Sequence, residues 1–313
     1  MPELELITLG RVGVDLYPEQ IGVPLSRVRT FAKSLGGSPT NVAVAAARLG
    51  HRSAVVTKVG ADGFGTYVRE ALTEFGVDDR FVGTDPELRT PIVFCEIHPP
   101  DDFPLLFYRQ PKAPDLNIGL ADLPLDEIAR VPVLWTSGTA LSDEPSRTAT
   151  LTALRAARGR TIHDLDHRPS FWPSPAVARD AALEALRHAR VAVGNIDEVE
   201  MATGSRDADA AAEALLRLGP ELAIVKRGPR GTLARTADER VEVPAVEVEV
   251  LCGLGAGDAF GGALCHGLLS GWPLSRTLAF ANAAGAIVAS RLACADAMPT
   301  VAEVDALLAG ARA

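Results

Sequence analysis

The sequence predicts an α/β protein built as one domain over residues 1–313. Short apolar segments such as Leu6–Leu9, Ser53–Val59 and Glu221–Lys226 are typical of buried strands, and helical segments separate them along most of the chain. This alternation indicates a parallel sheet covered by helices on both faces. With 313 residues and 47% hydrophobic content, the chain can bury one substantial core.

Two stretches, at about 11–34 and 88–111, interrupt the alternation of strands and helices. Both are extended and lack a helical period, and the second reads as a hairpin of two strands joined by the turn at 98–104. We therefore expect a small separate β-sheet that projects from the main body and covers a cleft as a lid.

Composition and charge exclude several classes of partner. The net charge of −9 argues against a broad nucleic-acid surface, which needs clustered Lys and Arg. The four cysteines are scattered and read as reduced thiols of a cytoplasmic protein. The N-terminal ten residues lack the pattern of a signal peptide, and no run of about 20 apolar residues predicts a membrane span. We expect neither nucleic-acid nor membrane partners.

The elements follow one another in a regular order. The first half predicts strand 4–9, helix 42–49 with Ser38 as cap and Pro39 in its first turn, strand 53–59, helix 66–75, and hairpin strands 91–97 and 105–109. The second half predicts strand 131–138, helix 145–158, strand 161–166, helix 176–189, strand 191–194, helix 208–218, strand 221–226, hairpin strands 232–235 and 240–243, and helices 259–269, 275–292 and 301–311.

A glycine-rich stretch, Gly253–Gly262, leads directly into an apolar run without proline. Glycine allows positive φ and a close approach of ligand to backbone, and a helix N-terminus presents free N–H groups to an anion. Asp258 falls where that helix begins. It has two interpretations: a first-turn or capping carboxylate, or a general base that faces an anion held by the amides.

A second glycine pair, Gly36 and Gly37, precedes the predicted helix at 42–49 and marks a place where the backbone approaches another group closely. Asn41 follows them. Its amide can both donate and accept hydrogen bonds, which suits a sugar hydroxyl, but a structural asparagine fits the same position.

Polar residues gather at the ends of the predicted strands. They are Asp15, Asp164, Asp166, Arg168, Asn195, Glu198, Lys226, Gly228 and the loop Gly255–Asp258. The carboxyl ends of parallel strands share one edge of the sheet, and ligands bind there. Glycine amides, acids able to hold a divalent cation and an aspartate able to take a proton together suit phosphoryl transfer.

Several of these residues also have a purely structural interpretation. Asp15 can be a turn residue, and Asn195 followed three residues later by Glu198 is the pattern of a capping box. The segment Lys226–Gly228 can be a solvated turn. His163 and His167 flank two aspartates, but no further His or Cys has the spacing of a zinc site.

Three segments carry a family resemblance. Gly36–Ala43 and Gly255–Phe260 resemble the two signatures of the ribokinase-like carbohydrate kinases, and Asn195–Glu198 matches that family's Asn-x-x-Glu motif. The order and spacing of the motifs cover nearly the whole chain. The resemblance implies a three-layer α/β/α sandwich with a small β-sheet lid. It also implies ATP-dependent phosphorylation of a sugar-like hydroxyl with Mg²⁺.

The resemblance assigns a role to each matching residue. It makes Asp258 the catalytic base, and Gly255, Ala256 and Gly257 the anion hole for the γ-phosphate. The acceptor would contact Asp15, Gly36, Gly37 and Asn41; the nucleotide would contact Lys226, Gly228 and Gly257, with Asn282 near the adenine; Asn195 and Glu198 would belong to the Mg²⁺–phosphate region. In this family the lid is often shared between subunits, which implies a homodimer.

The chain departs from the family pattern at one position and resembles one subgroup at others. Cys252 stands where many members carry an aspartate, and a thiol cannot replace that carboxylate in the cation network. The segments Gly10–Pro18, Phe94–Ile97, Pro99–Pro104, Tyr108–Asp115 and Asp164–Pro169 resemble a subgroup whose acceptor is a keto-deoxy sugar acid.

A sugar acid carries a carboxylate, and arginines at the acceptor end of the site are suited to bind it. Arg109 and Arg168 can each bind a carboxylate in a bidentate way, although Arg109 and Lys112 can also be surface charges near Asp115.

Other functions remain as alternatives to a kinase of that acid. The nearest is a 2-keto-3-deoxygluconate kinase, followed by ribokinase or fructokinase, and then a non-catalytic sugar-binding protein of the same fold. A dinucleotide-dependent oxidoreductase would need a Gly-x-Gly-x-x-Gly pattern after the first strand, which Gly10–Gly13 does not provide.

Overall fold

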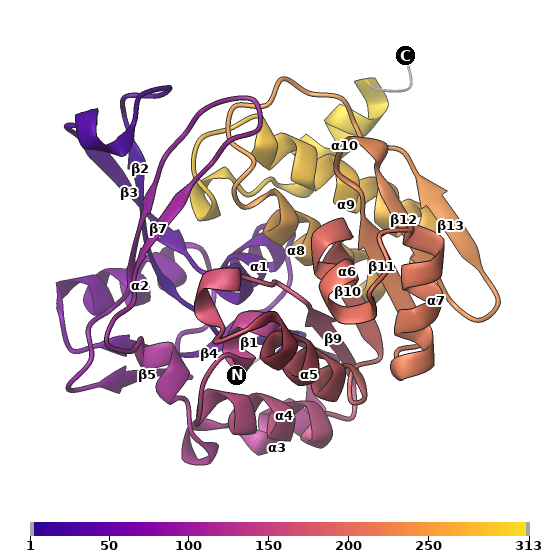
Figure 1. Cartoon of the computed structure of the whole chain (residues 1–313), viewed down its shortest axis with the longest axis horizontal. Coiled ribbons are helices and arrows are strands. Elements are labelled where there is room, and N and C mark those ends of the chain that lie inside the picture. Colours follow the sequence, from indigo (N-terminus) through magenta and orange to yellow (C-terminus); the bar gives the residue numbers. More distant parts are fainter. Residues whose placement is uncertain (1–2, 311–313) are drawn as a thin grey trace.

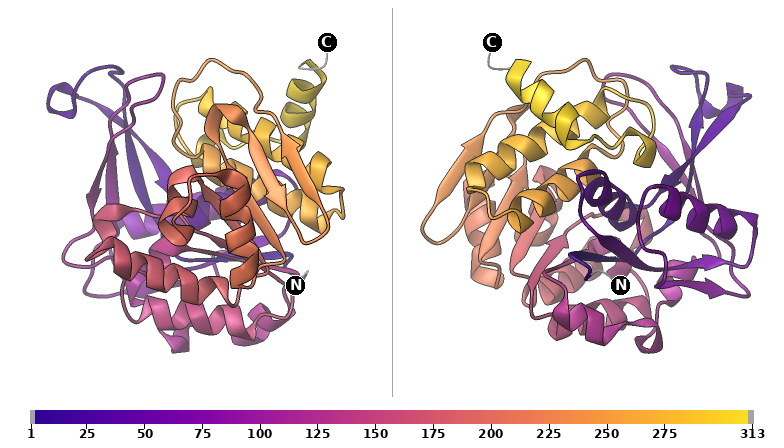
Figure 2. Two further views of the ribbon diagram at one scale, coloured as in Figure 1. Left: turned by 45° about the vertical axis from the view of Figure 1, so that its right-hand side comes forward. Right: turned by 180° about the vertical axis from the view of Figure 1, so that it is seen from behind.

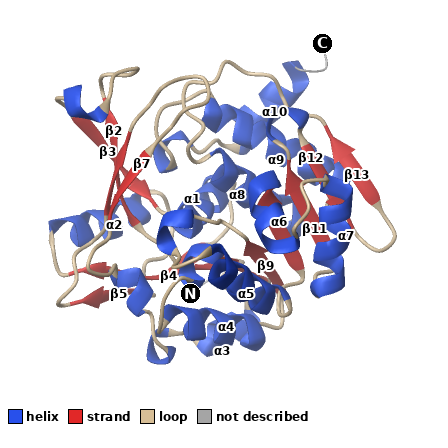
Figure 3. Cartoon of the chain, viewed as in Figure 1, coloured by secondary structure: helices blue, strands red, loops and turns tan. Residues whose placement is uncertain are grey.

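The computed structural model describes residues 3–310 and has a large central sheet with helices on both sides, plus a smaller sheet at one end (Figures 1 and 3). The strands are β1 (Leu6–Leu9), β2 (Gly13–Pro18), β3 (Phe31–Gly36), β4 (Ser53–Gly60), β5 (Val82–Asp85), β6 (Ile92–Cys95), β7 (Leu105–Tyr108), β8 (Val133–Ser137), β9 (Arg160–Asp164), β10 (Val191–Asn195), β11 (Leu222–Lys226), β12 (Thr232–Arg235) and β13 (Arg240–Val243). The helices are α1 (Ser38–Arg48), α2 (Gly63–Glu74), α3 (Leu125–Arg130), α4 (Ser146–Ala156), α5 (Pro175–Leu186), α6 (Ile196–Thr203), α7 (Ala208–Leu218), α8 (Ala256–Leu269), α9 (Leu274–Ala289) and α10 (Val301–Gly310).

The central sheet has nine strands in the order β13-β12-β11-β10-β9-β8-β1-β4-β5. All neighbours are parallel except β11–β12 and β12–β13, which form the antiparallel edge. The chain builds outward from β1 first to β4 and β5, and then to β8 and beyond on the other side. The strand order therefore reverses beside β1, and such a reversal point opens a crevice at the carboxyl ends of the strands.

Two layers of helices cover the sheet. One core cluster joins one face of the strands to α1, α2, α8, α9 and α10, and two further clusters join the other face to α3–α7. The C-terminal helices lie beside α1 on the same side of the molecule (Figure 2). The predicted α/β class is thus confirmed. No helix among residues 3–310 is long and apolar enough to cross a membrane.

The small sheet has the order β3-β2-β6-β7, and its two faces differ in chemistry. Strand pairing aligns Asp15 with Val93, and Leu16 with Phe94. Because side chains alternate along a strand, Asp15 shares one face with Val93 and, on β7, with Phe107. The opposite face carries Phe94 and Tyr108, whose rings are 5.4 Å apart.

Several local predictions differ from the structure. The N-cap of α1 is Gly37, with φ of 106°, and not Ser38; the Ser38 hydroxyl instead bonds to Asp258. Strand β5 and the short helix α3 were not predicted, since each has few residues and a weak periodic pattern. The last helix is described to Gly310, and the predicted end at residue 311 lies outside the described residues.

Helices α1 and α8 approach each other closely because glycine and alanine meet at their contact. A Cβ atom added to Gly262 would lie 2.3 Å from the Ala45 Cβ, and one added to Gly261 would lie 2.7 Å from the Trp135 ring. Cβ atoms do not approach that closely, so the separation of α1 and α8 depends on Gly262, and the packing of α8 against β8 depends on Gly261.

Replacement of Gly262 by alanine should therefore lower the free energy of unfolding by about 1–3 kcal/mol, the usual cost of overpacking a core. Equilibrium unfolding in urea measures this change. Gly63→Ala in α2 is the matched control, because no atom lies within 4 Å of its added Cβ; it should be neutral or slightly stabilising. An equal stability of the two variants would contradict the packing argument.

Candidate active site

Asp258 lies in the first turn of α8 and is held by residues of α1. Asn41 Nδ2 donates a 2.8 Å hydrogen bond to Asp258 Oδ2, and the Ser38 hydroxyl bonds to the same carboxyl group. Burial raises the pKa of Asp258 to about 6, although the hydrogen bond from Asn41 opposes the rise and the charge of Asp166 adds to it. Asp258 is therefore fixed in position, and its pKa allows it to accept a proton near neutral pH.

Asp15 is the second buried carboxylate of the site and comes from the small sheet. An added Cβ on Gly36 would lie 2.2 Å from Asp15 Oδ1, so the carboxyl group rests directly on the glycine. Burial raises the pKa of Asp15 to about 6, the charge of Arg11 lowers it, and the charge of Asp258 raises it. The two aspartates thus act electrostatically on each other across the same space.

The glycine loop before α8 forms an anion site. Gly255 is the N-cap of α8 with φ of 81°, a conformation that favours glycine, and an added Cβ would lie 2.8 Å from Cys294 Sγ. The first-turn amides that follow are free of intrahelical partners. The Lys226 ammonium stands near this end, because an added Cβ on Gly257 would lie 3.5 Å from Lys226 Nζ. Free amides and a cation together suit a phosphate group.

Lys226 also faces a cluster of acids. Its Nζ atom lies 3.7 Å from Asp164 Oδ2. Burial disfavours the charged form of Lys226, but the charges of Asp164, Glu198 and Asp258 raise its pKa overall. Burial likewise raises the pKa of Asp164 to about 7 and raises that of Glu198, while Lys226 opposes both shifts. The carboxylates lack enough positive charge around them, so a further cation would stabilise their ionised forms.

Asn195 and Glu198 form the capping box of α6, the structural alternative that the sequence left open. The Asn195 side chain accepts hydrogen bonds from the backbone of Asp197 and Glu198, and Glu198 Oε2 accepts one of 2.7 Å from the Asn195 backbone. This geometry leaves Glu198 buried near Lys226, and within residues 3–310 no hydrogen bond engages its Oε1 atom.

The residues fit a magnesium ion that a nucleotide brings with it. Within residues 3–310 no three His, Cys, Asp or Glu side chains are grouped as a protein cage for a metal. Mg²⁺ needs no such cage, because it keeps several waters and binds one or two carboxylates together with substrate phosphates. Glu198 and Asp164 supply oxygen donors of this kind near the glycine loop.

Asp166 and Arg168 follow β9 and complete the edge of the site. Asp166 has φ of 30°, which is rare for a residue other than glycine, and its Oδ2 accepts a 3.0 Å hydrogen bond from Thr139. Its Oδ1 accepts a 3.1 Å bond from Arg168 Nε. The Arg168 side chain remains 40% exposed. Backbone strain of this kind is typical of functional sites.

Other predicted site residues lie farther from this cluster or are already paired. Arg109 Nη2 donates a 2.6 Å hydrogen bond to Asp115, and both side chains are buried. Asn282 Oδ1 accepts a 2.7 Å hydrogen bond from Thr232 Oγ1 of β12, and its Nδ2 atom donates one of 2.9 Å to the Pro244 carbonyl in the segment after β13. Gly228 is exposed in a short turn, as the solvated-turn alternative expected.

Cys252 is buried behind the glycine loop. It belongs to an apolar cluster with Tyr17, Cys95 and Cys294, and these cysteines are free thiols. Tyr17 and Cys294 are in hydrogen-bond contact at 2.7 Å. The position that carries an aspartate in many ribokinase-like kinases is thus part of an apolar packing layer here.

Sequence reasoning did not assign a site role to Arg11, Ser38 or Thr139. Ser38 and Thr139 bond to Asp258 and Asp166, and the charge of Arg11 acts on Asp15. The signal for Arg11 was available, because it comes two residues after the end of the first predicted strand, where open α/β sheets bind ligands.

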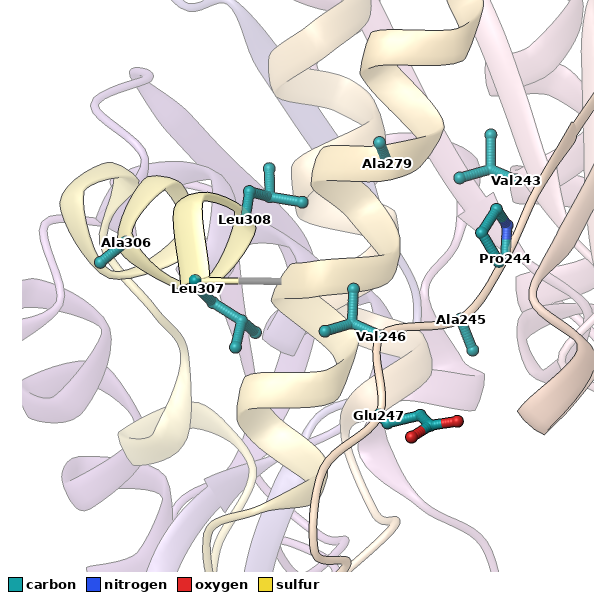
Figure 4. A pocket seen from close by; sticks show the side chains of 10 residues that line it. Val243, Pro244, Ala245, Val246, Glu247, Ala279, Ala306, Leu307 and Leu308 are labelled. Atoms are coloured by element: carbon teal, nitrogen blue, oxygen red, sulfur yellow. The ribbon is translucent and has the colours of Figure 1, made fainter. Parts of the chain in front are cut away.

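A groove of about 810 Å³ lies along α9 and α10, near Asn282 (Figure 4). It is lined by Val243, Pro244, Ala245, Val246, Glu247, Ala279, Ala306, Leu307, Leu308 and Gly310. Gly285 of α9 touches Ala256 of the glycine loop, and Asn282 and Ala279 follow at successive turns toward the start of α9. The groove is therefore lined mostly by apolar side chains and lies two helical turns along α9 from the contact with the glycine loop. This placement suits a flat ring attached to phosphates.

This fold and site define a phosphotransferase that moves a phosphoryl group to a hydroxyl: a glycine-led helix end and a lysine for the phosphate face a buried aspartate for the proton. The chain belongs to the pfkB family of carbohydrate kinases, whose model matches residues 4–301.

Named relatives and a solved structure agree with this family. The chain is 32% identical to the 5-dehydro-2-deoxygluconokinase of Halalkalibacterium halodurans, covering 98% of this chain and 95% of that protein. It is 33% identical to the enzyme of the same name from Listeria monocytogenes, covering 99% and 97%. The ATP-bound fructokinase of Xylella fastidiosa superimposes with a TM-score of 0.86 at 26% identity, covering 99% of each chain.

The raised pKa values predict how activity depends on pH. kcat/KM should fall as the pH drops below about 6, because protonation of Asp258 and Asp15 removes the proton acceptor and the charge pattern of the site. Asp258→Asn keeps the shape but cannot accept a proton, so kcat should drop at least ~100-fold above pH 6, where the wild-type carboxylate is ionised. ADP release measures both effects, and unchanged nucleotide affinity is the control. Near-normal turnover of Asp258→Asn would refute the role of the base.

Proposed function

We propose that this chain is an ATP-dependent kinase that phosphorylates 5-dehydro-2-deoxygluconate, a sugar acid of myo-inositol breakdown. The observation that carries the kinase chemistry is Asp258, buried and held by Asn41 at the glycine-led start of α8. The names of the relatives at 32–33% identity over nearly the full chain support the choice of acceptor.

In this proposal Asp258 takes the proton from the acceptor hydroxyl as that oxygen attacks the γ-phosphate. The amides of Gly255, Ala256 and Gly257 stabilise the negative charge on the transferred group, and Lys226 assists them. The contacts of Asp258 with Asn41 and of Asp15 with Gly36 support this placement of the acceptor.

The acceptor would lie between the small sheet and the main body. Asp15 and Asn41 would bind its hydroxyl groups, and Gly36 and Gly37 let the Asp15 carboxyl group and the Arg11 backbone pack directly beside them, where a side chain would clash. We propose that the segments 11–34 and 88–111 act as the lid over it.

ATP would extend from the glycine loop along α9. Lys226 and Gly228 would lie beside its phosphates, and the groove next to Asn282 would take the adenine (Figure 4). Bound Mg²⁺ would neutralise phosphate charge, with Glu198 and the Asn195 region as its protein contacts, through water where they do not reach it.

The carboxylate of a sugar acid needs a cation, and the two predicted arginines differ in how far the protein already pairs them. Arg168 is partly exposed and bonded through Nε alone, so its two Nη atoms remain available. Arg109 is neutralised by Asp115 in a buried pair. We therefore propose Arg168 as a contact of the acceptor and give Arg109 a positioning role at the base of the lid. A 2-keto-3-deoxygluconate kinase would use the same groups.

The assay that decides the function measures ADP release with ATP, Mg²⁺ and a panel of acceptors. 5-dehydro-2-deoxygluconate should give a higher kcat/KM than 2-keto-3-deoxygluconate, ribose or fructose. Excess chelator should abolish activity and added Mg²⁺ or Mn²⁺ should restore it, since oxygen donors prefer these ions. Efficient use of ribose or fructose, or activity in excess chelator, would contradict the proposal.

The outer face of the small sheet suits a second copy of the chain. Leu106 and Tyr108 are 47% and 60% exposed, and they lie beside the Phe94 ring. Apolar residues clustered on one face of a sheet are typical of an interface. We propose a homodimer joined through this face, in the cytoplasm where ATP is supplied.

Leu106→Asp combined with Tyr108→Asp should therefore halve the mass in sedimentation equilibrium, because buried carboxylates oppose association. Leu120→Asp is the control: this residue is 54% exposed elsewhere on the chain, so its substitution should leave the mass unchanged. A wild-type protein that sediments as a monomer would rule out the dimer.

A further inference from the structure

Arg11 is a buried arginine whose guanidinium group has no partner in the described part of the chain. It follows β1 at the point where the strand order reverses, and 7% of its surface is exposed. Among residues 3–310, no side chain or carbonyl accepts a hydrogen bond from its guanidinium group or lies within ion-pair distance, and its Nε atom is buried without a partner. A buried cation in this state is costly unless an anion joins it.

The structure fixes Arg11 firmly in place. Its backbone carbonyl accepts a 3.0 Å hydrogen bond from Thr40, and it lies so close to Gly37 that an added Cβ there would be 2.3 Å away. Its guanidinium group stands 5.7 Å from the centre of the Phe107 ring, which is in the range of a cation–π contact. Phe107 in turn packs edge-on against Phe171. A rigid and stacked guanidinium is prepared to bind a planar anion.

Arg11 is close enough to both aspartates of the site for its charge to act on them. Its charge lowers the pKa of both Asp15 and Asp258, so it acts on the place where the acceptor would lie. Yet neither carboxylate approaches it within the distance of an ion pair. By contrast, Arg109 is held by Asp115 in a buried ion pair, and Arg168 binds Asp166 through Nε and is 40% exposed, so neither is a buried cation that lacks a countercharge.

We propose that Arg11 binds the carboxylate of the acceptor and selects a sugar acid over a neutral sugar. This inference rests on the proposed function as a kinase of such an acid. A carboxylate matches the fork of a guanidinium with two parallel hydrogen bonds, and it would satisfy the donors that the protein leaves free. A neutral hydroxymethyl group in that place would leave the cation unpaired.

The test compares the acid with the matching compound whose carboxylate is reduced to a hydroxymethyl group. Binding of each to the full chain is measured by calorimetry without ATP, and turnover by ADP release. Arg11→Met should weaken binding of the acid and lower its kcat/KM about 10–150-fold, the effect of losing one charge-assisted hydrogen bond. Binding of the reduced compound and KM for ATP should stay within about twofold.

Arg11→Lys is the matched variant, because it keeps the charge and loses the fork. It should recover part of the affinity for the acid. An equal loss for both compounds would show that Arg11 only maintains the structure, and no loss for the acid would show that another group binds the carboxylate; either result overturns the proposal. Thermal unfolding of each variant checks the fold.

The acceptor preference of the wild-type protein tests the proposed function separately from the role of Arg11. If the wild type prefers another sugar acid, the same comparison is made with that acid and its reduced form, and the role of Arg11 is still decided. If the wild type binds and phosphorylates the reduced compound as well as the acid, the selective role of Arg11 is wrong whatever the kinase activity.

Discussion

The site depends on an excess of buried carboxylates at one edge of the sheet. Asp15, Asp164, Asp166, Glu198 and Asp258 gather there and face three cations, Arg11, Arg168 and Lys226. Burial raises the pKa of Asp15 and Asp258 to about 6. The charge of Lys226 favours the ionised forms of Asp164 and Glu198, and Arg168 is paired with Asp166. Such an arrangement keeps a base available near neutral pH, and it attracts the metal cation that accompanies a nucleotide.

The fold supplies this concentration of charge through close backbone packing. The small contact residues of α1 and α8 let the two helices approach, and this approach is what allows Asn41 to reach Asp258. In the same way Gly36 accommodates the Asp15 carboxyl group and Gly255 accommodates Cys294. The glycines of the site therefore act twice: they free amides for an anion, and they let polar groups from distant segments meet.

Much of this could be predicted from sequence because the signals are local. The alternation of strands and helices predicts the sheet, and residues that follow parallel strands, such as Asp164 and Lys226, must share an edge. Pairing between side chains is not local. The sequence left open whether Arg109 binds a substrate carboxylate or is a surface charge near Asp115. Only the structure shows that Arg109 and Asp115 form a buried pair. The same holds for Ser38, where a tertiary bond to Asp258 competes with a helix cap.

The contrast between Arg109 and Arg11 shows why sequence position alone does not identify an anion site. Both arginines stand where a strand ends, and both lie against an aromatic ring, Phe171 or Phe107. They differ in whether the protein already supplies the countercharge. Arg109 has Asp115, so a substrate carboxylate would compete with a pair that is already desolvated. Arg11 has no countercharge within ion-pair distance among residues 3–310, so binding an anion would relieve the cost of its burial. Because Phe107 belongs to β7 of the small sheet and Arg11 to the link between β1 and β2, the stacking contact also ties the position of that sheet to the cation. An acidic acceptor that bound Arg11 would therefore favour the arrangement in which Asp15, on the same face of the sheet as Phe107, lies closest to Asp258.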